Sequence, residues 1–285
     1  MNSGWDCSEA NGKHAKSNTA GAVNNVEYEK ENNEMTIGAF LIARLSSSRL
    51  PQKNIMPIAG KPMILQLAER VARAGCIDKV IVTTSQDPTD DPLEAVARDG
   101  SVECFRGPLD NIMERIVGAA RAHKCNTIVE LLGDNPLVHC DLIDEVVEFY
   151  RDGGYDYAAN VSRDYAVSEA EMKLFSIGVR IQVYSRAAAE QHMAYRDYIA
   201  NDERHPCAYI FDHPDIFKVG YVEAKGRWAF MNRPELTWAV NYPKNFELVR
   251  TIFEAQYPAD INFPLKNVYR QLEQQPELAL LMGGE

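Results

Sequence analysis

The chain of 285 residues is long enough for one large α/β domain with an appendage, or for two small domains. Its hydrophobic fraction of 46% is typical of a globular protein and excludes disorder throughout. The net charge of −11 argues against a nucleic-acid partner. No apolar run predicts a transmembrane helix or a secretory signal, so we expect no membrane partner. The six cysteines form no CxxC pair, which is typical of reduced thiols and favours a cytoplasmic location.

Residues 1–35 differ in composition from the rest of the chain. They contain no Leu, Ile or Phe, but seven Asn and six acidic residues. Such a segment cannot bury enough apolar surface to offset the entropy lost on ordering. We therefore predict a disordered N-terminal tail over residues 1–35 and a folded domain over residues 36–285.

In the first half of this domain, strand and helix patterns alternate. Short apolar runs predict strands, and apolar residues at helical spacing predict helices. We expect Gly75 to stop the first helix, Asp91 to cap the second ahead of Pro92, and Asp141 to open the fourth. The alternation predicts a mostly parallel sheet flanked by helices, an α/β fold. The expected strands span residues 36–43, 79–84, 102–107 and 127–133, and the helices span 63–75, 91–98, a segment with Ile112 and Ile116 inward, and a segment from Asp141.

The second half of the domain is less regular. Apolar runs there predict four further strands, and two helices follow from helical spacing, one capped by Ser185 and one with Pro243 near its start. The expected strands are 156–161, 175–185, 216–224 and 235–241, and the helices are 185–198 and 243–257.

A basic loop, residues 43–53, follows the first expected strand. It brings Arg44, Arg49 and Lys53 together with three consecutive serines. Ligands of open α/β sheets bind at the carboxyl ends of the strands, and hydroxyl, guanidinium and ammonium groups suit a polyphosphate. The loop matches neither a Walker motif nor GxGxxG. A solvated basic loop without a ligand is the alternative reading from composition alone.

A second polar turn, Gly133-Asp134-Asn135-Pro136, follows the expected strand 127–133. Its aspartate falls at the same edge of the sheet as the basic loop, where it could hold a Mg²⁺ ion that bridges phosphates. The alternative is an ordinary turn aspartate.

Together these motifs resemble those of the cytidylyltransferases that activate acidic sugars. That family includes the 3-deoxy-manno-octulosonate and sialate enzymes and the spore-coat polysaccharide type. The resemblance covers about residues 37–257, in order and with plausible spacing. The matching segments are ARxxSxRLPxK (43–53), IxGKP (58–62), TTSxDP (83–88), FRGxxD with the arginine that follows it (105–115), GDxPL (133–137), VYSRAA (183–188) and NYPKNFELVR (241–250).

The resemblance implies a GT-A-like nucleotidyltransferase domain over residues 36–285, with CTP as co-substrate. It implies transfer of CMP to an acidic acceptor, a sugar acid or a phosphate or phosphonate, with release of pyrophosphate. The catalytic residues it implies are Arg44, Arg49, Lys53 and Asp134. Asp134 and Asn241 would be the ligands of Mg²⁺, although the family pattern usually has an aspartate at position 241. Further nucleotide-binding positions would be Ala43, Ser46, Ser48, Lys61, Thr84, Ser85, Arg106, Asp110 and Gly133.

Two other functions stay open from the residues. One is a GT-A glycosyltransferase that uses a nucleotide sugar, although no DxD motif ends a strand in the first half. The other is a non-catalytic nucleotide-binding relative, which the neutral Asn241 favours. The resemblance also implies a homodimer, with Phe175, Trp228 and Phe230 as candidate interface residues. Candidate residues for binding an anionic acceptor are Arg163, Arg180, Arg186 and His205.

Overall fold

A computed structural model describes residues 35–163, 171–194 and 206–283. The predicted tail, residues 1–35, lies outside this part apart from Met35, so its disorder stays a prediction. His205 also lies outside the described residues.

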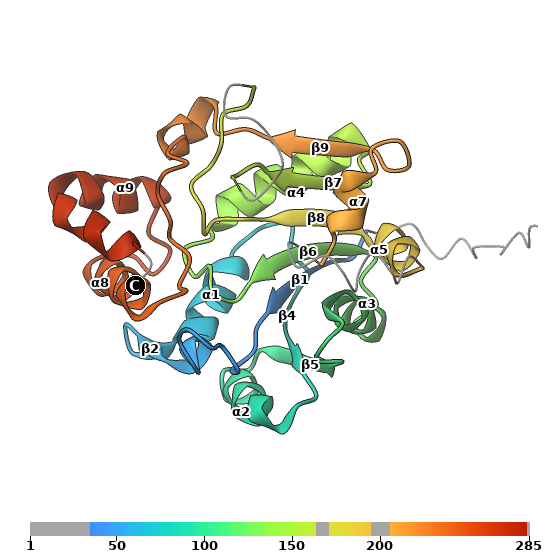
Figure 1. Cartoon of the computed structure of the whole chain (residues 1–285), viewed down its shortest axis with the longest axis horizontal. Coiled ribbons are helices and arrows are strands. Elements are labelled where there is room, and N and C mark those ends of the chain that lie inside the picture. Colours follow the sequence, from blue (N-terminus) through green and yellow to red (C-terminus); the bar gives the residue numbers. More distant parts are fainter. Residues whose placement is uncertain (1–34, 164–170, 195–205, 284–285) are drawn as a thin grey trace, which may run out of the picture. The chain divides into compact units, whose positions relative to one another are not determined.

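A seven-stranded sheet forms the centre of the described chain, in the order β5-β4-β1-β6-β8-β7-β9 (Figure 1). β8 is antiparallel to both of its neighbours, and the other adjacent strands pair in parallel. This confirms the predicted mostly parallel α/β fold. The strands are β1 (Ile37–Ile42), β4 (Lys79–Ser85), β5 (Glu103–Gly107), β6 (Thr127–Leu132), β7 (Tyr157–Asn160), β8 (Gln182–Ser185) and β9 (Val219–Val222).

Helices cover both faces of this sheet, as the continuous apolar runs of the strands require. Along β1, the side chains of Ala39 and Leu41 belong to one core, and that of Phe40 belongs to the other. The first core packs against α1 (Met63–Val71), α4 (Cys140–Gly153), α8 (Pro243–Gln256) and α9 (Leu265–Gln274). The second core packs against α3 (Ile112–Ala122), α5 (Arg186–Met193) and α7 (Ala208–Asp212).

Shorter elements complete the described chain. Ser185 caps α5, as predicted, by accepting a hydrogen bond from the backbone N–H of Ala188 at 3.0 Å. The remaining elements are the hairpin of β2 (Pro57–Ile58) and β3 (Lys61–Pro62), helix α2 (Asp91–Asp99) and the 3-10 helices η1 (Lys53–Ile55), η2 (Pro88–Asp90), η3 (Gly226–Met231) and η4 (Pro276–Met282).

One expected strand, residues 175–185, is wrong in part, and another, residues 235–241, is wrong as a whole. Of residues 175–185 only the last four join the sheet, because Gly178 turns the chain at a φ of +91° and the side chain of Asn160 bonds Val179 and Ile181. Residues 235–241 form no strand. Their backbone makes isolated contacts instead, including a hydrogen bond from Val240 N–H to the carbonyl of Asp134 at 2.8 Å.

Helix ends also differ from the expectations. α1 ends at Val71, four residues before Gly75. Asp91 is the first residue of α2, and the N-cap position belongs to Asp90. Helix α9 was not predicted, although Leu265, Val268 and Leu272 are buried along it at helical spacing.

Two of the three apolar residues proposed for a dimer interface are buried in the core of the chain. Phe175 is fully buried and Trp228 is 6% exposed, and both belong to the core of the chain. Phe230 is half-buried against the same core. Phe175 and Trp228 are therefore core residues of the single chain, whereas the homodimer and a role of Phe230 in it stay predictions. Within the described residues no helix is both long and apolar enough to cross a membrane.

Candidate active site

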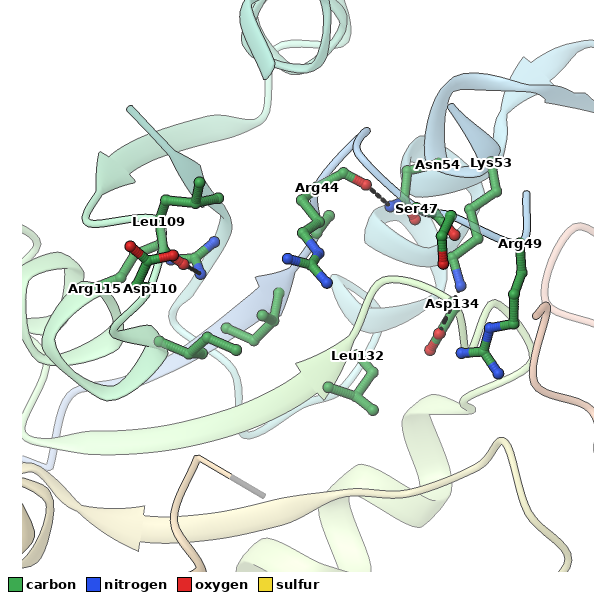
Figure 2. Close-up of a pocket in the computed structure, with 14 residues that line it drawn as sticks. Arg44, Ser47, Arg49, Lys53, Asn54, Leu109, Asp110, Arg115, Leu132 and Asp134 are labelled. Carbon is green, nitrogen blue, oxygen red and sulfur yellow. Dashed lines mark hydrogen bonds and ion pairs between the residues drawn. The ribbon is translucent and has the colours of Figure 1, made fainter. Parts of the chain in front are cut away.

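The candidate site lies where the direction of the strand order reverses. From β1 the chain adds β4 and β5 on one side, and it then returns to place β6 on the other side of β1. Ligands of open α/β sheets bind at such a switch point, outside the carboxyl ends of the strands. A cavity of about 440 Å³ opens there, which we call the strand-end cavity. It is lined by Ile42, Ala43, Arg44, Ser47, Ser48, Arg49, Lys53, Asn54, Leu109, Asp110, Ile112, Arg115, Leu132 and Asp134 (Figure 2).

Lys53 and Asp134 form the central ion pair of the cavity. The Lys53 Nζ lies 2.8 Å from Asp134 Oδ2, and it also donates to the carbonyl of Val240 at 2.7 Å. The side chain of Lys53 is only 9% exposed, so its ammonium group is held by protein oxygens and not by bulk water. A buried cation beside one carboxylate, at the edge of a cavity, is suited to meet an anionic ligand.

Arg49 lies at the same end of the cavity, on its exposed rim. Its Nη2 donates to the side-chain oxygen of Asn241 at 3.2 Å, and its guanidinium lies 5.3 Å from the ring centre of Tyr242. Asn241 Oδ1 is also 3.5 Å from Lys53 Nζ. The segment before α8 thus orients both cations of the basic loop, although Asn241 itself is not part of the cavity lining.

Asp90 fixes the start of the basic loop. Its carboxylate is fully buried and accepts from the backbone N–H of Leu45 at 2.7 Å. It also accepts from the hydroxyl of Thr84 at 3.0 Å, from Ser85 N–H at 3.2 Å and from the hydroxyl of Ser85. Asp90 therefore joins the carboxyl end of β4 to the loop after β1. Sequence reasoning missed this role because Asp90-Asp91-Pro92 resembles an ordinary helix start.

Gly133 allows β6 to end close to β1. A Cβ atom at this position would lie 2.9 Å from the Cβ of Ala43 and 3.0 Å from both Asn54 Oδ1 and the carbonyl of Ile42. The backbone N–H of Gly133 donates to that same carbonyl at 2.8 Å. The glycine thus lets the next residue, Asp134, reach the basic loop.

The opposite end of the cavity is formed by the β5–α3 loop and by α3. Leu109, Asp110 and Arg115 come from the β5–α3 loop and from α3, and Arg44 stands between them and Lys53 (Figure 2). Arg115 is 1% exposed, and its Nη2 donates to the carbonyl of Leu109 at 3.4 Å. Burial lowers the pKa of its guanidinium.

The structure brings together half of the site residues that the sequence predicted. Asn241 contacts two of them from outside the lining. Ser46 is exposed and is not part of the cavity lining. Gly133 packs against Ala43 and Asn54, which do line the cavity. The predicted residues that line the cavity are Ala43, Arg44, Ser48, Arg49, Lys53, Asp110 and Asp134.

The other four predicted positions lie outside the strand-end cavity. Lys61 pairs with Glu69 at 2.8 Å, which raises the pKa of this lysine. Arg106 pairs with Asp91 and Glu94 at 2.6 and 2.9 Å, and these acids raise its pKa. Thr84 and Ser85 are fully buried and bind Asp90. Their part in the site is to hold the basic loop, through Asp90, rather than to face the cavity.

Several lining residues were not predicted. Asn54 donates to the carbonyl of Arg44 at 3.1 Å, and its own side-chain oxygen is buried without a hydrogen-bond partner. Ser47 lies inside the basic loop, and its neighbours were predicted in its place. Apolar lining cannot be told from core in a sequence. The remaining missed positions are Ile42, Leu109, Ile112, Arg115 and Leu132.

The acceptor residues proposed from sequence are not in this cavity. Arg186 pairs with Glu190 and donates to the carbonyl of Cys125 at 3.3 Å. Arg180 is 8% exposed, and Arg163 is exposed. None of these three described arginines lines the strand-end cavity.

Oxygen atoms around Lys53 have the chemistry of a magnesium site. One carboxylate oxygen (Asp134), one amide oxygen (Asn241) and one backbone carbonyl (Val240) lie 2.8, 3.5 and 2.7 Å from Lys53 Nζ. Mg²⁺ takes hard oxygen ligands and is commonly held by one or two carboxylates, with phosphate and water oxygens completing the shell. The residues present therefore fit the ion, with Asp134 as the only charged ligand among these three donors.

A mostly parallel sheet with a basic loop and an aspartate at its switch point defines an α/β protein whose ligand site lies at the carboxyl ends of the strands. A cytidylyltransferase from Leptospira borgpetersenii shares this fold, with a TM-score of 0.75, 20% identity, and coverage of 88% of this chain and 99% of that one. A family model described as cytidylyltransferase matches residues 39–275. The chain belongs to the cytidylyltransferase family, which uses CTP.

The sequence is also similar to those of two named proteins. It is 26% identical over 220 residues to the spore coat polysaccharide biosynthesis protein SpsF of Bacillus subtilis, covering 75% of this chain and 85% of that protein. It is 34% identical over 113 residues to the 3-deoxy-manno-octulosonate cytidylyltransferase of Geobacter metallireducens, covering 40% and 44%. The second match spans less than half of either chain.

Proposed function

We propose that this enzyme transfers CMP from CTP to an acidic sugar and releases pyrophosphate at the strand-end cavity. The observation that carries the proposal is the convergence of Arg49, Lys53 and Asp134 on one cavity, the first two from the basic loop after β1 and the third from the turn after β6. The family supplies the nucleotide, and the similarity to a 3-deoxy-manno-octulosonate cytidylyltransferase supports a sugar acid as acceptor.

In the proposed reaction, an acceptor oxygen attacks the α-phosphorus of CTP. The bond from that phosphorus to the bridging oxygen breaks, and pyrophosphate leaves with the bond's electron pair. The acceptor hydroxyl or carboxyl proton passes to solvent. No covalent enzyme intermediate is needed, so the protein contributes positioning and charge neutralisation. Lys53 and Arg49 are placed to neutralise the charge that develops on the departing pyrophosphate.

Asp134 and Asn241 are the side chains that would hold a magnesium ion in this site. When bound, the ion neutralises phosphate charge and orients the triphosphate. Lys53 already contacts the oxygens of Asp134 and Asn241, so a divalent ion would share these ligands with the ammonium group unless triphosphate oxygens offered the lysine another partner. We therefore expect metal binding to depend on CTP.

The acceptor end and the assembly remain proposals. The three described arginines first expected to bind the acceptor do not line the cavity, and a phosphate or phosphonate is the alternative acceptor to a sugar acid. A homodimer and a cytoplasmic location likewise stay predictions.

A pyrophosphate-release assay tests the proposed function. The protein is mixed with CTP, Mg²⁺ and, one at a time, sugar acids, neutral sugars, sugar phosphates and phosphonates. We expect release with a sugar acid and none when the acceptor is omitted or neutral. A screen in which no acidic acceptor releases pyrophosphate would contradict the proposal, and conversion with a phosphonate alone would change the acceptor class.

A further inference from the structure

The side-chain amide of Asn245, in the first turn of α8, holds the backbone on both of its sides. Its Oδ1 accepts from the backbone N–H groups of Asn241 and Tyr242 at 3.2 and 3.0 Å. Its Nδ2 donates to the carbonyl of Leu281 at 2.9 Å and to that of Gly283 at 3.5 Å. The residue is 3% exposed. These four contacts match the two acceptor and two donor sites that an amide offers.

The start of α8 needs such a side chain. Backbone N–H groups at the beginning of a helix have no partner within the helix, and the N–H groups of Asn241 and Tyr242 come directly before Pro243, which has none to donate. Asn245 supplies an acceptor for both. The carbonyl of Leu281 decides which way its amide faces, because a flipped amide would set oxygen against oxygen.

The segment that Asn245 holds is also the one that orients the cations of the basic loop. Asn241 Oδ1 accepts from Arg49 Nη2 at 3.2 Å and lies 3.5 Å from Lys53 Nζ. The carbonyl of Val240 accepts from the same Nζ at 2.7 Å. A rotation of this backbone would therefore move the Asn241 oxygen away from both cations, although Asn245 itself is not part of the cavity lining.

We infer that Asn245 is a positioning residue for the proposed reaction. It sets the orientation of Asn241 and, through Asn241, that of Arg49 at the rim of the strand-end cavity. The inference rests on the proposed function, in which Asn241 would hold Mg²⁺ and Arg49 would neutralise phosphate charge. Removal of a residue that orients metal ligands without touching the metal commonly lowers metal affinity or activity about 10- to 100-fold.

Two substitutions separate the two sets of contacts that Asn245 makes. Asn245→Asp keeps oxygens that accept from Asn241 and Tyr242, but it can no longer donate to Leu281. Asn245→Ala loses both sets. Dissociation constants of CTP are measured by calorimetry at a fixed excess of Mg²⁺ and without an acceptor. We expect CTP to bind about 10- to 100-fold more weakly to Asn245→Ala, and within about 3-fold of wild type to Asn245→Asp.

Ser185→Ala is the matched control for the loss of a contact at a helix start. Ser185 caps α5 by accepting from the N–H of Ala188 at 3.0 Å, and it does not line the strand-end cavity. Urea unfolding should show that Asn245→Ala and Ser185→Ala are both destabilised, whereas only Asn245→Ala should lose affinity for CTP.

Two results of these measurements would overturn the inference. If Asn245→Ala were destabilised but bound CTP as wild type does, the role of Asn245 would be structural only. If Asn245→Asp bound CTP as weakly as Asn245→Ala, the contacts with the N–H groups of Asn241 and Tyr242 would not be the ones that support nucleotide binding.

Amide hydrogen exchange decides the matter even if Asn245→Ala fails to fold. The N–H groups of Asn241 and Tyr242 both donate to Asn245. In the wild-type chain and in Asn245→Asp, both amides should therefore exchange at least about 10-fold more slowly than in an unfolded chain. Exchange of both amides at the unfolded rate in the wild type would show that Asn245 does not hold this segment.

A failure of the proposed function would look different. The CTP and exchange measurements need no acceptor, so a screen without pyrophosphate release leaves their outcome unchanged. If Lys53→Met and Arg49→Ala both left CTP affinity unchanged, the strand-end cavity would not be the nucleotide site. The proposed function would then fail there first, whatever the variants of Asn245 show.

Discussion

Lys53 Nζ lies 2.8 Å from Asp134 Oδ2, although the two residues are 81 positions apart in the chain. The pair exists because β1 and β6 are parallel neighbours whose carboxyl ends meet, and because Gly133 lets the two loops approach. It sets a lysine that is 9% exposed beside the aspartate expected to hold the metal. The charge balance of this pair is central to the proposed chemistry.

The basic loop should bind the β- and γ-phosphates of CTP. Arg49→Ala and Lys53→Met should each weaken CTP binding by about 1.5–3 kcal/mol, the range for hydrogen bonds to charged groups. CMP lacks those phosphates and should be affected much less. Calorimetry with both nucleotides checks this, and Lys61→Met is the control, because Lys61 pairs with Glu69 outside the cavity. Equal losses for CTP and CMP would count against the placement.

Asp90 should matter for both stability and nucleotide binding without touching the nucleotide. Asp90→Asn puts a donor among the donors of Leu45, Thr84 and Ser85, so we expect the free energy of unfolding to fall by at least about 1.5–3 kcal/mol. CTP affinity should fall too, because the loop start is no longer fixed. Urea unfolding and CTP titration measure the two effects.

The neighbouring acid provides the control for this variant. Asp91 is exposed and pairs with Arg106 at the surface, so Asp91→Asn should change stability by less than about 1 kcal/mol. If Asp90→Asn lowered the free energy of unfolding no more than Asp91→Asn does, Asp90 would not be the residue that fixes the start of the basic loop.

Glu130 should make stability depend on pH. It lies within β6, is 1% exposed, and accepts from the hydroxyl of Tyr184 at 2.6 Å and from Gln182 Nε2 at 2.9 Å. Burial raises the pKa of Glu130. A carboxyl whose folded pKa exceeds its unfolded value of about 4.3 gives stability that is full below that value and is lost as pH rises through the folded pKa.

Glu130→Gln should remove this contribution. The stability of the wild type relative to the variant should therefore rise as pH falls toward about 4.3. Urea unfolding of both proteins over a series of pH values measures the difference. Two stability curves that stay parallel across this range would show that Glu130 does not titrate differently in the folded and unfolded chains.

A substitution at position 241 tests whether this residue is a ligand of the metal. Asn241 offers a neutral oxygen, so Asn241→Asp should bring a second charge to the site and lower the Mg²⁺ concentration needed for half-maximal turnover. The aspartate would also pair with Arg49, which now donates to the amide oxygen. A magnesium titration of pyrophosphate release checks the shift. Identical titrations for wild type and variant would mean that residue 241 does not contact the metal.

The sequence predicted the sheet and the basic loop because their patterns are local. Strands β1, β4 and β6 are rich in apolar and β-branched residues, and the residues that end β1 and β6 meet whenever those strands are parallel neighbours. Asp134 and Lys53 could therefore be assigned to one site. Residues 235–241 look equally strand-like, but their partners are an aspartate carbonyl and an isolated bridge.

Residues that act through tertiary contacts could not be found in this way. Arg115 lies on a helix whose pattern indicates only an apolar face, and its burial beside the cavity depends on the β5–α3 loop folding over it. Asp90 resembles a helix cap, and its true partners come from the loop after β1. Lys61 was assigned from its motif alone, although the hairpin that carries it turns toward Glu69.

The most direct test of the account is the initial rate of pyrophosphate release by Asp134→Asn compared with wild type, at saturating CTP and Mg²⁺ with the best acceptor. Val240 still accepts from Lys53 in the variant, so circular dichroism and urea unfolding should show an intact fold. The account predicts a rate at least about 100-fold lower, because the charged ligand for the metal is lost. A folded Asp134→Asn protein with the wild-type rate would contradict it.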